Sequence, residues 1–61
     1  MTARERKAIV DALRASRPGT GAPDESFKTW FLTQRSISNA LLAQGAITEA
    51  SQDTFDMACG N

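Results

Sequence analysis

The sequence predicts an all-α fold, a small three-helix domain with a long central helix and a Pro/Gly-rich loop after the first helix. Large apolar residues recur at helical spacing over residues 24–44, and no stretch alternates apolar and polar residues as a half-buried β-strand does. A cluster of prolines and glycines in residues 16–23 and the single Gly45 divide the chain into three segments. We therefore expect helices near residues 3–15, 24–44 and 49–58, within a single domain that spans residues 1–61.

The first helix is expected to begin with a capping box. Thr2 and Glu5 have the required spacing, with the threonine hydroxyl accepting from a backbone amide and the glutamate reaching back to the N-cap. The next residues place Ile9, Val10 and Leu13 on one side of the helix. Three large apolar side chains are too few to keep a helix folded alone, so this one should dock on the central segment.

Glycines and prolines also set the other boundaries. Residues 16–23 contain two prolines and two glycines, which predicts a flexible loop. Gly45 is typical of the left-handed residue that ends a helix, and Thr48 can cap the helix that follows. The last helix is expected to be short and weak, and residues 59–61 to form a frayed tail.

The central helix should carry the core. Its six large apolar residues fall within an arc of about 140° on a helical wheel. Gln34 and Ser38 lie in the middle of that arc. We expect them to meet polar groups of another helix, to receive a polar group of a partner, or to lie at the rim of the domain. The apolar residues of the arc are Phe27, Trp30, Phe31, Ile37, Leu41 and Leu42.

The composition argues against catalysis. The chain has no histidine and one cysteine, Cys59. A serine or cysteine nucleophile therefore lacks its usual base, and a lone thiol cannot hold zinc. Asp53 and Asp56 lie one helical turn apart and are typical of a solvated helix face. We expect no enzymatic activity, no cofactor and no metal.

The sequence also indicates a compartment. A lone cysteine is typical of a reducing environment, and the N-terminus lacks the apolar run of a secretory signal. No apolar stretch approaches the roughly 20 residues needed to span a bilayer. We therefore expect a cytoplasmic protein with no membrane association.

Size favours a binding function. A chain of 61 residues buries little surface, and a partner protein or a second copy, as in a homodimer, could supply more. The favoured function is a small non-enzymatic regulatory protein acting by protein–protein binding, such as a phage- or plasmid-type modulator of host machinery, for example transcription. Tryptophan, phenylalanine and arginine recur at binding hot spots, although Trp30 and Phe31 also suit a core. The candidate partner-binding residues are Trp30, Phe31, Gln34, Arg35 and Ser38.

The alternative function is DNA binding. If the central segment breaks near Arg35 and Ser36, its second half resembles the recognition helix of a helix-turn-helix protein. A net charge of zero and a turn without glycine argue against this alternative. The two functions therefore divide on whether the helix over residues 24–44 is continuous. The candidate DNA-contact residues are Arg4, Arg6, Lys7, Gln34, Arg35, Ser36, Ser38 and Asn39.

Overall fold

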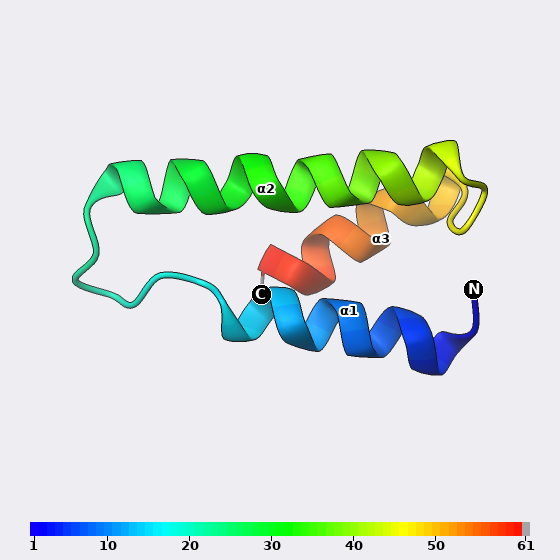
Figure 1. The fold of residues 1–61 in the computed structure, drawn as a ribbon, viewed down its shortest axis with the longest axis horizontal. Coiled ribbons are helices and arrows are strands. Elements are labelled where there is room, and N and C mark those ends of the chain that lie inside the picture. The colour runs from blue at the N-terminus through cyan, green and yellow to red at the C-terminus, as the bar shows by residue number, and fades with distance from the viewer. Residues whose placement is uncertain (61) are drawn as a thin grey trace.

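The computed structural model describes residues 1–60 and contains three helices in this part of the chain. They are α1 (Ala3–Ala15), α2 (Asp24–Ala43) and α3 (Glu49–Gly60). Helices α1 and α2 run in opposite directions, and α3 packs against both of them (Figure 1). The described residues form no strand, which confirms the predicted all-α fold. None of these helices is long and apolar enough to cross a bilayer.

Helix α1 begins at the predicted capping box. The backbone amide of Glu5 donates to the Thr2 hydroxyl at 3.1 Å, and the Thr2 amide donates to the Glu5 carboxylate at 3.1 Å. The bond that the Thr2 backbone amide donates to this carboxylate lowers the pKa of Glu5, and the Thr2 hydroxyl beside the carboxylate lowers it further. The Thr2–Glu5 spacing in the sequence therefore predicted the start of this helix correctly.

Helix α2 is continuous, so the predicted alternative of a break near Arg35 and Ser36 is wrong. Both residues lie inside a single 20-residue helix. The physical reason is that residues 24–44 contain no glycine or proline that could interrupt the backbone hydrogen bonds.

Gly45 ends α2 as predicted. Its φ of 74° is left-handed. The Ala46 amide donates to the Leu41 carbonyl at 2.9 Å, and the Gly45 amide donates to the Leu42 carbonyl at 3.0 Å. These two bonds form a Schellman motif, which satisfies carbonyls at the end of the helix and turns the chain back toward α1.

The Gly45→Ala variant is expected to lower the free energy of unfolding by about 1–2 kcal/mol, because a side chain is strained at this backbone conformation. Crowding adds nothing, since a Cβ there would meet no atom within 4 Å. Gly60→Ala is the matched control, because Gly60 is also uncrowded but lies in α3 without a positive φ. Urea unfolding should show a loss for Gly45→Ala only. Equal midpoints for the two variants would contradict the prediction.

Helix α3 is longer than expected. Thr48 caps it as predicted, with its hydroxyl accepting from the Ser51 amide at 3.2 Å. The helix then continues through Cys59 to Gly60, and the Cys59 side chain is fully buried. Of the tail that was expected to fray, these two residues are helical, and Asn61 lies outside the described residues.

The buried core lies between α3 and the other two helices, with Ile47 entering from the turn before α3. Four of the six large apolar residues of α2 pack at its edge and are partly buried. Phe27 is partly buried outside this cluster, and Phe31 is 56% exposed. The expectation that all six would form the core is therefore wrong for these two phenylalanines. The buried apolar residues are Leu13, Ile47, Phe55 and Cys59.

Helix length explains the difference. The 20 residues of α2 extend over about 30 Å, whereas the 12 residues of α3 extend over about 18 Å. Because α3 starts at the C-terminal end of α2 and runs back along it, the first turns of α2 lie beyond the end of α3 (Figure 1). No helix of the described chain packs over that end of α2.

Candidate functional site

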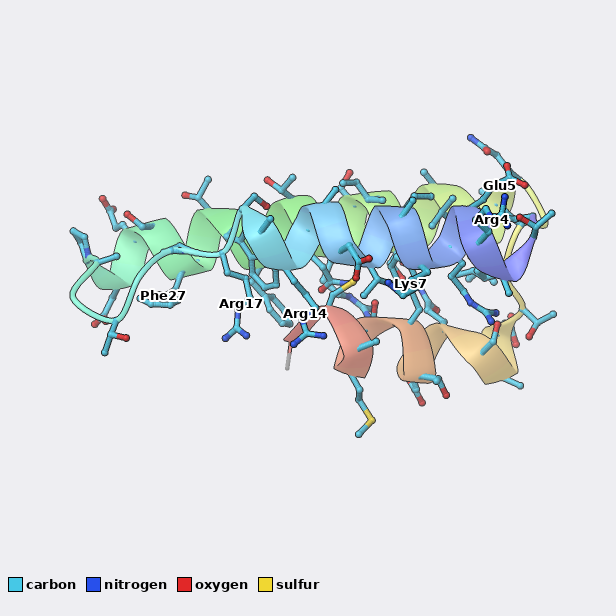
Figure 2. The ribbon with its side chains drawn as sticks, turned by 90° about the horizontal axis from the view of Figure 1, so that it is seen from below. Arg4, Glu5, Lys7, Arg14, Arg17 and Phe27 are labelled. Carbon is cyan, nitrogen blue, oxygen red and sulfur yellow. The ribbon has the colours of Figure 1, made fainter. Side chains whose placement is uncertain are left out.

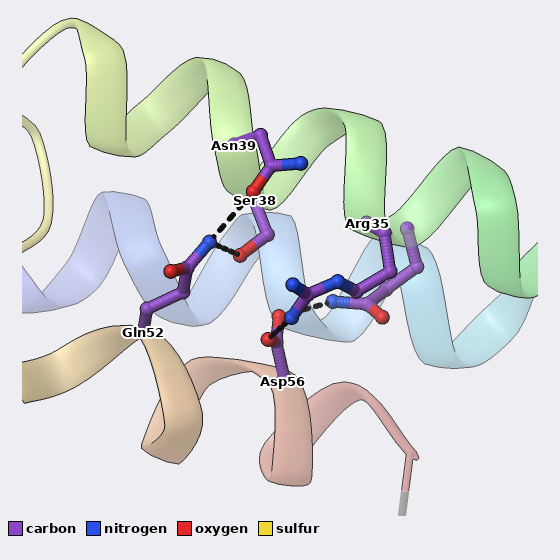
Figure 3. Close-up of polar contacts among 6 residues, drawn as sticks. Arg35, Ser38, Asn39, Gln52 and Asp56 are labelled. Carbon is purple, nitrogen blue, oxygen red and sulfur yellow. Dashed lines mark hydrogen bonds and ion pairs between the residues drawn. The ribbon is translucent and has the colours of Figure 1, made fainter. Parts of the chain in front are cut away.

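The polar residues in the middle of α2 are its most buried positions. Gln34 is 1% exposed and Ser38 is fully buried. The Gln34 amide donates to a carboxylate oxygen of Asp56 at 2.6 Å, and the Gln52 amide donates to the Ser38 hydroxyl at 3.1 Å (Figure 3). Of the three roles expected for these polar residues, contact with another helix is therefore the one observed.

Two further contacts complete this polar interface between α2 and α3. The second carboxylate oxygen of Asp56 forms an ion pair with Arg35, and Gln52 also donates to the Asn39 side-chain oxygen at 2.9 Å. The Asp56 side chain is 16% exposed, so the expectation that it lies on a solvated face with Asp53 is wrong. Asp56 lies four residues after Gln52 on α3, so both side chains face α2, whereas Asp53 is exposed.

This interface buries two of the side chains that the sequence offered to a partner, Gln34 and Ser38. In residues 1–60, no buried side-chain nitrogen or oxygen lacks a hydrogen-bond partner. Gln34 and Ser38 thus hold α3 in register against α2 rather than lying on the surface. Of the five candidate partner-binding residues, Phe31 is exposed, Trp30 is half-buried and the Arg35 side chain is 42% exposed.

The candidate DNA-contact residues do not share one face. Arg6 and Lys7 line a groove of about 420 Å³ between α1 and α3, and Lys7 pairs with Asp11 at 2.8 Å. On α2, Ser36 is exposed but lies about 160° around the helix from the buried Gln34. Arg4 and Asn39 are exposed as well, on different helices. DNA contact stays a prediction. The recognition helix on which it depended required a break in α2, and α2 is continuous.

A second surface lies at the uncovered end of α2. It is an open groove of about 590 Å³, which we call the Phe31 groove. Phe31 is 56% exposed and Leu32 is 61% exposed, which is unusual for two adjacent large apolar residues on one helix. Phe27 and Arg17 lie on the same side of the molecule as the C-terminal end of α3 (Figure 2). The groove is lined by Arg17, Phe27, Lys28, Trp30, Phe31, Leu32 and Gly60.

Trp30 fixes one wall of the Phe31 groove. Its indole N–H donates to the Leu13 carbonyl at 3.0 Å and to the Ser16 hydroxyl at 3.1 Å. The Arg17 guanidinium lies 5.6 Å from the centre of the indole ring, a cation–π distance. The tryptophan therefore joins α2 to the end of α1 and holds Arg17 at the edge of the groove.

Sequence reasoning placed Phe31 and Trp30 in the candidate site but missed Arg17, Lys28 and Leu32. A signal for Leu32 was present, because it lies outside the apolar arc of α2 on a face that an amphipathic helix normally leaves polar. Lys28 precedes it by one helical turn. No comparable signal in the sequence joins Arg17 to this surface, because that contact depends on how α1 and α2 pack.

The chain offers few groups for chemistry. Within the described part, no cluster of histidine, cysteine, aspartate and glutamate could hold a metal ion. Burial raises the pKa of the Cys59 thiol, the nearby Asp56 charge raises it further, and Arg14 opposes both. A buried thiol with a raised pKa is a poor nucleophile.

A comparison of the chain with protein-family models, curated proteins and solved structures found no match. The function must therefore be argued from the surface itself.

Proposed function

We propose that this chain is a small non-enzymatic regulatory protein that acts by binding another protein, and that the Phe31 groove is the contact surface. The observation that carries the proposal is the exposure of Phe31 and Leu32 at the end of α2 that no helix within residues 1–60 covers. Apolar patches rimmed by polar residues are typical of interaction sites.

The groove also has the composition of a binding surface. Its apolar part contains phenylalanine and tryptophan, and its edge contains Arg17, and these residue types are enriched in interfaces. Trp30 is held by two hydrogen bonds, so this wall is ordered before a partner arrives. An ordered surface loses little conformational entropy on binding. The biological setting, a phage- or plasmid-type modulator of host machinery such as transcription, stays a prediction from size and composition.

The Phe31→Asp variant is expected to lose its protein partner. The change replaces the exposed Phe31 ring with a carboxylate, which the bound partner would bury at a cost in free energy. Tagged wild-type and variant proteins would be recovered from cells that carry the gene, and the co-purifying proteins compared by quantitative mass spectrometry. We expect one dominant partner to fall at least about tenfold, the loss typical of a hot-spot residue.

Met57→Asp is the matched control. Met57 is 65% exposed on α3 and does not line the groove, so the same change there should leave the partner bound. Circular dichroism must show that both variants remain folded, and Leu32→Asp provides a second groove variant. Recovery of the same partner by wild-type protein and both groove variants would contradict the proposal. So would tight, salt-sensitive binding of duplex DNA with no protein partner.

A further inference from the structure

We infer that the Phe31 groove binds an acidic amphipathic segment of the partner protein, one that carries large apolar side chains flanked by aspartate or glutamate. This inference rests on the proposed function and specifies the chemistry of the partner. The inference comes from the positive charge of the groove. The apolar surface alone would not determine whether the partner segment is acidic, neutral or basic.

The groove combines an apolar floor with unneutralised positive charge. Arg17 and Lys28 line it, and among residues 1–60 no carboxylate side chain does. Within residues 1–60 the ion pairs are Lys7 with Asp11 and Arg35 with Asp56, so neither cation of the groove is paired there. Two full positive charges therefore line the same groove as the exposed Phe31 ring.

The charges near the groove do not cancel the charges of its two cations. Arg14 extends from the end of α1 toward the same side as Arg17 (Figure 2), although it lines the groove between α1 and α3 rather than the Phe31 groove. The C-terminal end of α3 reaches the groove at Gly60, and its dipole supplies about half a negative charge, which is less than the charge of either cation. Asp24 precedes Lys28 by one turn on α2 but neither lines the groove nor forms an ion pair within the described residues.

The size of the groove limits what it can hold. A volume of about 590 Å³ is within the range of a small-molecule site and accommodates a few side chains rather than a folded domain. An amphipathic segment that inserts one or two apolar anchors and places carboxylates at the edge would complement both features. Such carboxylates would meet Arg17 and Lys28 in partly desolvated positions, where charge complementarity gives specificity.

The test is a selection of random 12-residue peptides displayed on phage, with wild-type protein as bait and Phe31→Asp protein for counter-selection. We expect the recovered peptides to carry net negative charge together with leucine, phenylalanine or tryptophan. One such peptide, made synthetically, should bind at least about fivefold more weakly when its acidic residues are changed to amides. The Arg17→Gln, Lys28→Gln double variant should bind the original peptide more weakly by a similar factor. It should bind the amide version of the peptide as tightly as the wild-type protein does.

Each contrary result has a distinct meaning. Peptides that are neutral or basic, yet are lost on Phe31→Asp, would overturn the acidic partner and leave the proposed function standing. A selection that yields no peptide sensitive to Phe31→Asp would overturn both. Sedimentation equilibrium that shows a wild-type dimer and a Phe31→Asp monomer would assign the groove to a second copy. Binding of a labelled DNA duplex that requires Arg17 and Lys28 would assign it to nucleic acid.

Discussion

Replacing Phe55 with alanine is expected to remove a large part of the free energy of unfolding of this domain. Phe55 is 2% exposed and belongs to the buried apolar cluster. Truncation of a buried phenylalanine costs about 3–5 kcal/mol. The total free energy of unfolding of a chain of this length is only roughly 3–9 kcal/mol. In thermal unfolding followed by circular dichroism, we expect the midpoint to fall by more than about 12 °C, or the cooperative transition to disappear.

Met57→Ala is the matched control for Phe55→Ala. Met57 lies two residues later on the same helix and is 65% exposed, so its truncation should change the free energy of unfolding by less than about 0.5 kcal/mol. Alanine has high helix propensity at both positions, so propensity does not confound the comparison. Equal shifts in the two midpoints would show that α3 does not carry the core.

The size of the Phe55 effect follows from the place of α3 in the fold. Helix α3 packs against both α1 and α2, whereas those two contact each other more weakly. The sequence indicated the opposite ranking, because α3 is short and has few large apolar residues. A residue count measures how much apolar surface a segment offers. Burial depends on how many neighbours surround the segment, and α3 has two.

The helix boundaries were predictable because their causes are local. The capping box at Thr2, the left-handed Gly45 and the Thr48 cap each act within a few residues, and each is present in the structure. The exposure of Phe31 was not predictable in this way. Periodicity placed it on the inward face of α2, but the described part of α3 does not extend over it.

The polar interface between α2 and α3 was predictable in part. Periodicity identified Gln34 and Ser38 as inward-facing, but could not say whether the matching polar groups belong to this chain or to another protein. A matching pattern exists in α3, where Gln52 and Asp56 have the same four-residue spacing and pair in the opposite direction along the chain. Such a pairing is what two antiparallel helices would produce. Reading the two patterns together would have placed the polar residues inside the domain.

Replacing Asp56 with alanine is the second large effect that we expect. The change removes the acceptor of the Gln34 amide, and Gln34 is 1% exposed. Leaving a buried donor without an acceptor costs about 1–3 kcal/mol. Urea unfolding would measure this loss. Asp53→Ala is the matched control, because Asp53 is an exposed carboxylate one turn earlier on α3, and its loss should change stability by less than about 0.5 kcal/mol.

Asp56→Asn separates the two bonds that Asp56 makes. Asparagine keeps an oxygen that can accept from Gln34 but loses the charge that pairs with Arg35, whose side chain is 42% exposed. Because ion pairs open to solvent contribute about 0–1 kcal/mol, Asp56→Asn should cost less than Asp56→Ala. Equal losses would mean that the ion pair, rather than the buried amide, holds α3 against α2. In that case added salt should lower the stability of the wild-type protein and leave both variants unchanged.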